Sequence, residues 1–191
     1  MEKFRRELTE FVQGIYEADR KVLVFGEGRI GAPVMMIGEA PGEQETLLGR
    51  PFVGKAGKNL DAFLEQAGMD RGELYVSNTV KFRPTKRSAA GRLVNRPPTQ
   101  EEIKLFLPWL LREIELVNPR CVITLGNVPL RALAGRRTVI GEVHGQRLPW
   151  QDRQLFPMYH PASVIYNPSL KAVYQEDVNR FAAWYRAGME V

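Results

Sequence analysis

The chain alternates short β-rich runs with segments whose apolar residues recur at helical spacing, and this order constrains its fold more than any other feature. The strand-like runs lie at residues 22–25, 34–38, 74–80, 121–126 and 155–160. Helical spacing occurs at residues 3–18, 56–67, 103–117, 129–134 and 174–185. Because strands that alternate with helices are typical of parallel sheets, we expect an α/β fold with helices on both faces of the sheet.

Residues at the ends of two helical segments support these boundaries. Thr99 and Glu102 have the spacing of a capping box, in which each side chain bonds the backbone N–H of the other residue. Gly68 follows the segment 56–67 in the position of a helix C-cap. The sequence has no internal repeat, low-complexity segment or linker, so we expect residues 1–191 to form a single domain.

The composition excludes several classes of protein. The 191 residues include one cysteine, which excludes a disulfide framework and any metal site built from four thiolates. No apolar run approaches the roughly 18 residues that a membrane span needs, so we expect a cytoplasmic protein without a membrane partner. The net charge of +5 permits a nucleic-acid partner without requiring one.

Two glycine-rich segments match nucleotide-binding motifs only in part. Residues 26–31 fit G-x-G-x-x-G, but Pro33 and a strand-like run follow where a dinucleotide site requires a helix. A glycine-rich hairpin is the favoured interpretation. Residues 49–56 fit a P-loop except at Ala56, which replaces the Ser or Thr that would hold magnesium. The sequence therefore disfavours both a dinucleotide enzyme and an ATPase.

Three loops follow predicted strands, at the edge where open α/β sheets bind ligands. They contain GEAPGEQE at 38–45 with GRPFVG at 49–54, Ser77 with Asn78, and YHPAS at 159–163. Together with residues 78–84, 123–126 and 156–161, these motifs resemble the uracil-DNA glycosylase superfamily, and within it family four, the iron–sulfur type. The resemblance spans nearly the whole chain. It implies a three-layer α/β/α sandwich with a central four-stranded parallel sheet.

The resemblance also implies an activity, the excision of uracil from DNA by a monofunctional hydrolase. Such an enzyme flips the deoxyuridine out of the stack and cleaves its N-glycosidic bond, leaving an abasic site. In this chain Phe52 would stack on the base, and the Asn78 amide would bind the O4 and N3–H edge of uracil. His160 would donate a hydrogen bond to uracil O2 as negative charge develops there.

A carboxylate is expected to position the attacking water and to stabilise the positive charge on the sugar. Glu39 and Glu45 are the candidates, and Glu39 ranks slightly above Glu45. The water-activating aspartate of the best-known superfamily members would fall at Ala40, which we expect beside the base. This departure leaves the choice between the two glutamates open.

Residues 75–100 carry six basic side chains and no acid, which favours contact with DNA phosphates. The expected phosphate contacts are Lys81, Arg83, Lys86, Arg87, Arg92 and Arg96. The segment 85–94 within this stretch is longer than the usual connection of the family. After His160 the resemblance places an apolar wedge that fills the gap left by the flipped nucleotide, and Val164 and Ile165 occupy that position.

Typical family-four members bind a four-iron cluster through four cysteines. The corresponding positions here are Phe11, Gly14, Phe82 and Phe106, none of which can bind iron. We therefore expect no metal and no cofactor, and an apolar contact among the three phenylalanine rings in place of the cluster. Cys121 matches no ligand position and is expected to be structural.

The leading hypothesis is thus a cluster-free uracil-DNA glycosylase that acts as a monomer on uracil-containing DNA of the nucleoid. Two alternatives stay open. The first is a catalytically weak DNA-binding relative, and the second is a glycosylase for another deaminated base such as hypoxanthine or xanthine. Asn78 favours uracil, whereas Ala40 keeps both alternatives open.

Overall fold

The computed structural model describes residues 1–189, and its centre is a mostly parallel sheet. Within these residues six strands lie in the order β1-β3-β2-β6-β8-β7. The four inner strands are parallel, and they are β3 (Tyr75–Asn78), β2 (Val34–Gly38), β6 (Cys121–Leu125) and β8 (Arg153–Met158). Short antiparallel strands, β1 (Glu27–Gly28) and β7 (Leu148–Trp150), extend the edges. The predicted four-stranded parallel sheet is therefore the centre of a wider one.

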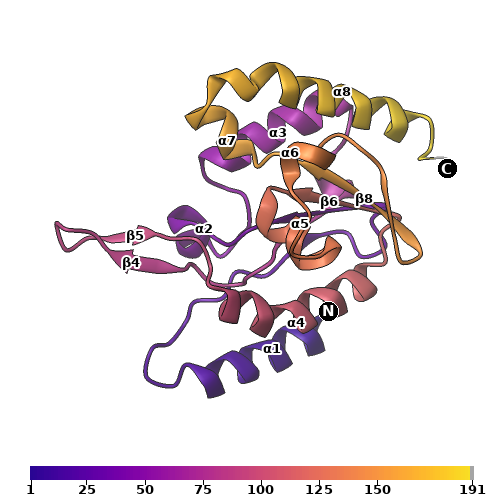
Figure 1. Ribbon diagram of the computed structural model, residues 1–191. Helices are drawn as coiled ribbons and strands as arrows, with labels where there is room; N and C mark the ends of the chain where they lie inside the picture. Colours follow the sequence, from indigo (N-terminus) through magenta and orange to yellow (C-terminus); the bar gives the residue numbers. More distant parts are fainter. Residues whose placement is uncertain (190–191) are drawn as a thin grey trace.

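Helices cover both faces of the sheet (Figure 1), which confirms the three-layer α/β/α arrangement. One face is covered by α3 (Lys55–Ala67) and α8 (Lys171–Arg186). The other face is covered by α4 (Gln100–Val117) and α5 (Asn127–Ala134), with α1 (Glu2–Ile15) outside α4. Three short helices lie in the connections, α2 (Glu43–Leu48), α6 (Ile140–Val143) and α7 (Pro161–Tyr166).

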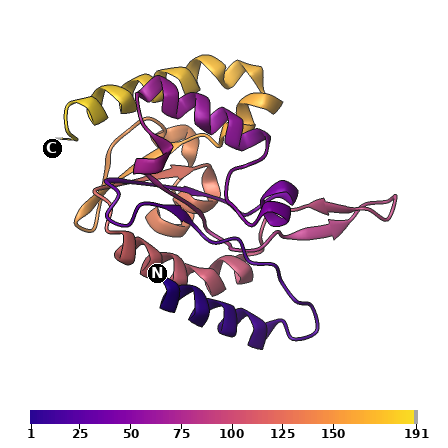
Figure 2. The same ribbon diagram turned by 180° about the vertical axis from the view of Figure 1, so that it is seen from behind.

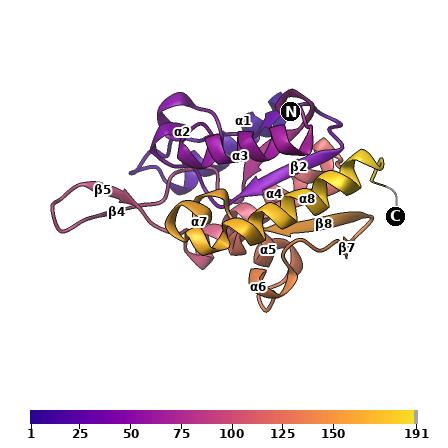
Figure 3. The ribbon, with the colours of Figure 1, turned by 90° about the horizontal axis from the view of Figure 1, so that it is seen from above.

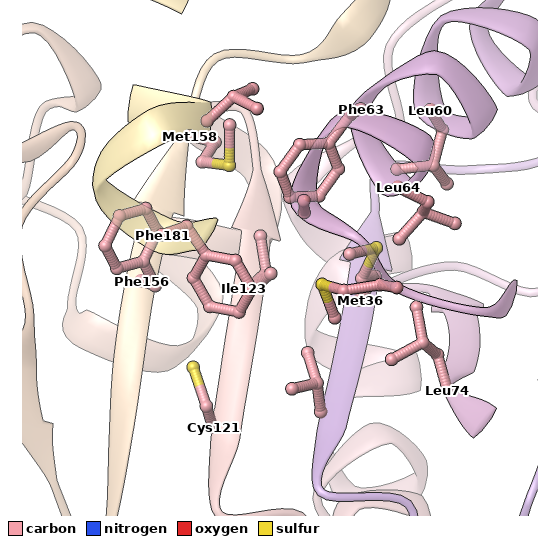
Figure 4. Packing of buried hydrophobic residues seen from close by; sticks show 14 of the residues in the cluster. Met36, Leu60, Phe63, Leu64, Leu74, Cys121, Ile123, Phe156, Met158 and Phe181 are labelled. Atoms are coloured by element: carbon pink, nitrogen blue, oxygen red, sulfur yellow. The ribbon is translucent and has the colours of Figure 1, made fainter. Parts of the chain in front are cut away.

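The larger part of the apolar core lies between the sheet and the pair α3 and α8 (Figure 4). Phe181 of α8 meets Phe63 of α3 and Phe156 of β8, with ring centroids 6.0 and 5.0 Å apart. Cys121 is fully buried in the same layer, and burial raises the pKa of its thiol. A protonated thiol away from solvent is a poor nucleophile, which agrees with a structural role.

Both predicted helix caps are confirmed. The Thr99 hydroxyl accepts a hydrogen bond from the Glu102 N–H at 3.2 Å, and Glu102 Oε2 accepts one from the Thr99 N–H at 2.7 Å. These bonds satisfy two backbone donors at the start of α4. Gly68 ends α3 in a left-handed conformation with φ of 66°.

Two expectations near the N-terminus are wrong. Residues 22–25 form no strand, and the Val24 N–H donates to the Lys81 carbonyl at 2.7 Å instead. The glycine-rich segment is not a hairpin between neighbouring strands, because β1 pairs with β3. Strand β2 is paired on both sides, with β3 and with β6, so neither of its edges is available to β1.

The long basic segment forms a hairpin that projects from the body of the protein (Figures 1 and 2). Its strands are β4 (Thr85–Arg87) and β5 (Leu93–Asn95), paired antiparallel. Seen from above, the hairpin, α2 and α7 lie at the same end of the molecule (Figure 3). This is the end at which the central parallel strands finish.

Aromatic side chains fill the space between α1 and α4, where the resemblance would place the iron–sulfur cluster. Phe82 and Phe106 meet edge to face, with ring centroids 5.6 Å apart. Phe11 instead packs on Trp109 at 5.2 Å, so the expected three-ring contact is wrong for this residue. The rings nevertheless belong to one apolar cluster that joins α1, α4 and the chain before the hairpin.

Among residues 1–189, no helix has the length and hydropathy that a membrane crossing requires.

Candidate active site

A cavity of about 290 Å³ opens at the carboxyl edge of the sheet. Five residues expected at the base, or to act on it, line this one cavity, namely Ala40, Glu45, Phe52, Asn78 and His160. They come from different loops, because Ala40 follows β2, Asn78 ends β3 and His160 follows β8. The parallel sheet thus brings together residues that are up to 120 positions apart, from Ala40 to His160.

Gly38 allows the aromatic and amide groups to pack against the end of β2. A Cβ atom at this position would lie 2.5 Å from Phe52 Cζ and 2.6 Å from Asn78 Oδ1. Neither ring nor amide could keep its place at such a distance. Any larger residue at 38 would therefore displace two of the groups that line the cavity.

Phe52 has a strained backbone, with φ of 52° in the left-handed region that non-glycine residues rarely adopt. Two neighbours hold it there. The Arg71 guanidinium donates to the carbonyl oxygens of Pro51 at 2.9 Å and Phe52 at 3.2 Å. Gly57 of α3 lets the Phe52 carbonyl approach, because a Cβ there would lie 1.9 Å from that oxygen. The surrounding residues thus fix a buried phenyl ring at the cavity wall.

Glu45 connects the two loops of the first motif through hydrogen bonds to its side-chain carboxylate. Its Oε1 accepts hydrogen bonds from the N–H groups of Val53 at 3.0 Å and Gly54 at 2.8 Å. Its Oε2 accepts one from the Gly42 N–H at 3.1 Å. Three backbone donors thus hold this carboxylate in place and fix the backbone that follows Phe52. Glu45 lines the same cavity as His160, and its expected role in catalysis stays a prediction.

His160 is held as a neutral imidazole with a defined tautomer. Its Nδ1 accepts a hydrogen bond from the Ala162 N–H at 3.1 Å, so the ring proton lies on Nε2. Burial lowers the pKa of His160 to about 4, although the nearby Glu45 charge opposes the shift. The ring lies nearly parallel to Phe52, with centroids 6.1 Å apart. An Nε2–H donor is thus available beside the aromatic wall at neutral pH.

A second cavity of about 190 Å³ adjoins the first and is lined by Glu39, Ala40, Asn95 and His160 among others. Glu39 is half-buried, and burial raises its pKa, which makes this carboxylate a better proton acceptor than a solvated one. Asn95 was missed by the sequence reasoning, because nothing in residues 93–97 marks it as a site residue. Its Oδ1 accepts from Arg83 Nε at 2.6 Å, which leaves the Nδ2 donor on the other side of the amide.

Lys81 cannot bind DNA, contrary to expectation, because its side chain is fully buried. Its Nζ donates to Glu113 Oε2 at 2.6 Å, to Ser77 Oγ at 2.7 Å and to the Asn78 carbonyl at 2.6 Å. Glu113 also accepts from the hydroxyls of Ser77 and Tyr75. This polar network lies under the backbone of Asn78, the residue expected to bind the base.

Arg96 and Arg83 also have structural partners. Arg96 forms a bidentate pair with Glu102, at 2.7 and 2.6 Å, and its Nε donates to the Thr85 carbonyl. Arg83 bonds Asn95 and Glu43. These contacts fasten the hairpin to α4 and α2, so the free phosphate contacts expected of both residues are not supported. Lys86, Arg87 and Arg92 remain exposed on the hairpin.

The apolar residues after His160 divide into two groups. Val164 is half-buried and does not line the cavity of about 290 Å³ that holds the expected base-binding residues, which we call the base cavity. Ile165 and Tyr166 both line it, and they are 44% and 86% exposed. The predicted loop 159–163 is in part helical, because α7 begins at Pro161 and continues to Tyr166, and its last two side chains line the cavity.

The four positions that would carry cluster cysteines do not fit an iron–sulfur cluster. Phe82 and Phe106 are buried aromatic residues, Phe11 is half-buried, and Gly14 has no side chain. In the described part of the chain, no group of three or more His, Cys, Asp or Glu residues is arranged to hold a metal ion.

Comparisons with known proteins agree with this geometry. The family model described as the uracil DNA glycosylase superfamily matches residues 25–183. Similar proteins include the type-4 uracil-DNA glycosylases of Pyrobaculum aerophilum and Saccharolobus solfataricus. The first is 39% identical, with 85% of this chain and 83% of that protein covered, and the second is 38% identical, with 84% and 75% covered.

A solved structure also shares the fold. The crystal structure of Pedobacter heparinus SMUG2 superposes with a TM-score of 0.52 at 14% identity, over 95% of this chain and 83% of that one. The family match covers most of the chain and includes every loop of the cavity. The chain therefore belongs to the uracil-DNA glycosylase superfamily.

Proposed function

We propose that this protein excises uracil from DNA by hydrolysis of the N-glycosidic bond and leaves an abasic site. The observation that carries the proposal is one cavity in which an aromatic wall, an amide and a neutral histidine donor meet. The names of the similar proteins, type-4 uracil-DNA glycosylase, support the same activity. We also propose that it acts as a monomer in the cytoplasm, on DNA of the nucleoid, without a metal or cofactor.

Base recognition would combine stacking with hydrogen bonding. The buried Phe52 ring offers a face against which a flipped pyrimidine can stack. The Asn78 amide can accept a hydrogen bond from uracil N3–H and donate one to uracil O4. Cytosine presents the reversed pattern at those two positions. The Lys81 ammonium donates a hydrogen bond to the backbone carbonyl of Asn78. The network beneath the cavity would therefore fix the backbone that carries the Asn78 amide.

The reaction would proceed by cleavage between C1′ and N1 of the deoxyuridine. The bonding electrons pass to the uracil ring, and the His160 Nε2–H stabilises the negative charge that develops on O2. A water oxygen bonds to C1′, and its proton passes to the Glu39 carboxylate. Glu39 and Asn95 line the same small cavity beside His160, so we propose that the Glu39 oxygens and the Asn95 Nδ2 donor hold this water.

Changing Asn78 to Asp should weaken the recognition of uracil at the cavity edge. An ionised carboxylate accepts two hydrogen bonds and donates none, so it would repel uracil O4. We expect uracil excision to fall by at least about 100-fold, because a mismatched buried polar edge is strongly disfavoured. Single-turnover excision from otherwise identical uracil oligonucleotides measures this. Retention of wild-type uracil excision would contradict the role of Asn78.

The exposed cations of the hairpin should bind DNA phosphates. Changing Lys86, Arg87 and Arg92 together to Gln should reduce the slope of log affinity against log salt by up to about 2.7 for duplex DNA, at about 0.9 per lost phosphate contact. A matched control changes three exposed cations in and just after α1, Lys3, Arg6 and Arg20, to Gln. Equal effects of the two triple variants would show that the hairpin has no special part in binding.

Base specificity is tested with oligonucleotides that contain uracil, hypoxanthine or xanthine, in single and double strands. Alkaline cleavage reveals abasic product. We expect product from uracil alone. Product mainly from hypoxanthine or xanthine would favour the second alternative. No product from any substrate, with DNA binding intact, would leave a DNA-binding relative.

A further inference from the structure

Tyr166 lies at the mouth of the base cavity with its ring almost entirely in solvent. It is 86% exposed although it lines the cavity, and Ile165 beside it is 44% exposed. Among residues 1–189, no side chain bonds the Tyr166 hydroxyl. The fold therefore makes no use of this ring. An aromatic side chain that is solvent-exposed next to a ligand cavity is available to cover the ligand or what surrounds it.

Hydrogen bonds hold the helix that carries Tyr166. Helix α7 begins at His160, and the Pro161 carbonyl accepts a hydrogen bond from Asn59 Nδ2 of α3 at 3.0 Å. The last turn is closed by a bond from the Asn167 N–H to the Ser163 carbonyl at 2.8 Å. His160 is thus the N-cap of one short helix and Tyr166 its last residue, so the backbone that carries the ring is held in place relative to the histidine.

We propose that Tyr166 stacks on the base adjacent to the extruded uracil and thereby holds single-stranded as well as duplex DNA at the site. The inference rests on the proposed function. Every base has a face on which an aromatic ring can stack, so this contact needs neither a particular sequence nor a partner strand. An aliphatic wedge such as Ile165 acts differently, because it fills a gap that exists only within a stacked duplex. Tyr166 would therefore contribute to the binding of both single-stranded and duplex DNA, and Ile165 to the binding of duplex DNA.

Binding to DNA with a stable abasic analogue in place of deoxyuridine tests the proposal without requiring catalysis. Stacking of one base on an aromatic ring corresponds to about 5- to 150-fold in affinity. We expect Tyr166→Leu to weaken single-strand binding by about 10-fold or more and duplex binding by less, since Ile165 still fills the gap within the duplex. Tyr166→Phe should match the wild type on both. Ile15→Ala, which changes an exposed residue at the far end of α1, should do the same.

A fluorescent base identifies the contact. With 2-aminopurine next to the abasic analogue, stacking on Tyr166 quenches the emission, so the Tyr166→Leu complex should be brighter than the wild-type and Tyr166→Phe complexes. Equal affinities and equal emission for all three proteins would overturn the proposal. A loss of affinity in Tyr166→Leu that is seen with uracil-containing DNA but not with the abasic analogue would also overturn the proposal. The ring would then act on the extruded base. If the wild type binds as expected but excises no uracil, the proposed function fails while the stacking result still stands.

Discussion

Changing His160 to Ala should slow uracil excision by about 100- to 1,000-fold, the usual cost of removing one donor that stabilises developing negative charge. Binding to DNA with an abasic analogue should stay within about threefold of wild type, because the His160 donor acts on the departing base. The measurement is single-turnover excision at saturating enzyme, paired with a binding titration. Equal losses in rate and affinity would contradict the assigned role.

The second histidine of the chain provides the control. His144 lies near the buried Asp177 carboxylate, with its Nδ1 at 2.9 Å from Oδ2, and it does not line the base cavity. His144→Gln keeps a donor toward Asp177, so we expect wild-type excision. A large loss in this variant would show that the effect of the first substitution is not specific to the cavity.

The pH dependence gives an independent test of the neutral state of His160. With a pKa of about 4, the ring is uncharged at pH 6 to 8, so the rate should not rise as pH falls through that range. The Glu39 carboxylate must be ionised to accept a proton, and its pKa is raised by burial. The rate should therefore fall on the acid side as pH drops through that raised pKa. An increase in rate between pH 7 and 6 would indicate a protonated histidine instead.

Changing Lys81 to Met should destabilise the protein by about 3–5 kcal/mol, because it leaves the fully buried Glu113 carboxylate without its cation. Among residues 1–189, the hydroxyls of Tyr75 and Ser77 would then be the remaining hydrogen-bond donors to this carboxylate. Chemical denaturation measures the free energy of unfolding. The double variant Lys81→Met with Glu113→Leu should be less destabilised than the single one, because neither buried charge remains.

Lys86→Met is the matched control for this substitution. It makes the same chemical change on the exposed hairpin, where we expect less than about 0.5 kcal/mol of change in stability. DNA affinity should respond in the opposite order, with a salt-dependent loss for Lys86→Met. If Lys81→Met were as stable as Lys86→Met, the buried ion pair would not contribute as described.

The sequence predicted the elements whose signals are local. The capping box of Thr99 and Glu102, the left-handed Gly68 and the apolar spacing of α4 each lie within a few residues, and all three are found in the structure. The candidate site was found through motif order. Phe52, Asn78 and His160 then line one cavity, because their loops lie at the carboxyl edge of the same parallel sheet.

Three of the errors concern cations whose acidic partners lie outside the acid-free segment 75–100. Within residues 75–100 there is no acid, yet Lys81 pairs with Glu113, Arg96 with Glu102 and Arg83 with Glu43. One sequence feature could have indicated the pair of Lys81 and Glu113. Glu113 falls beside Ile114 on the buried stripe of α4, and an acid at such a position needs a buried partner. Asn95 had no comparable signal, because only the fold brings the hairpin base to the cavity.

Uracil excision by metal-free protein is the decisive measurement for a uracil-DNA glycosylase that needs no iron–sulfur cluster. The purified wild-type chain, treated with chelator and analysed for iron and sulfide, is incubated with single- and double-stranded oligonucleotides containing one uracil. We predict abasic product in amounts that do not depend on iron content. A protein that binds these oligonucleotides but forms no abasic product, or whose activity rises and falls with bound iron, would contradict the account.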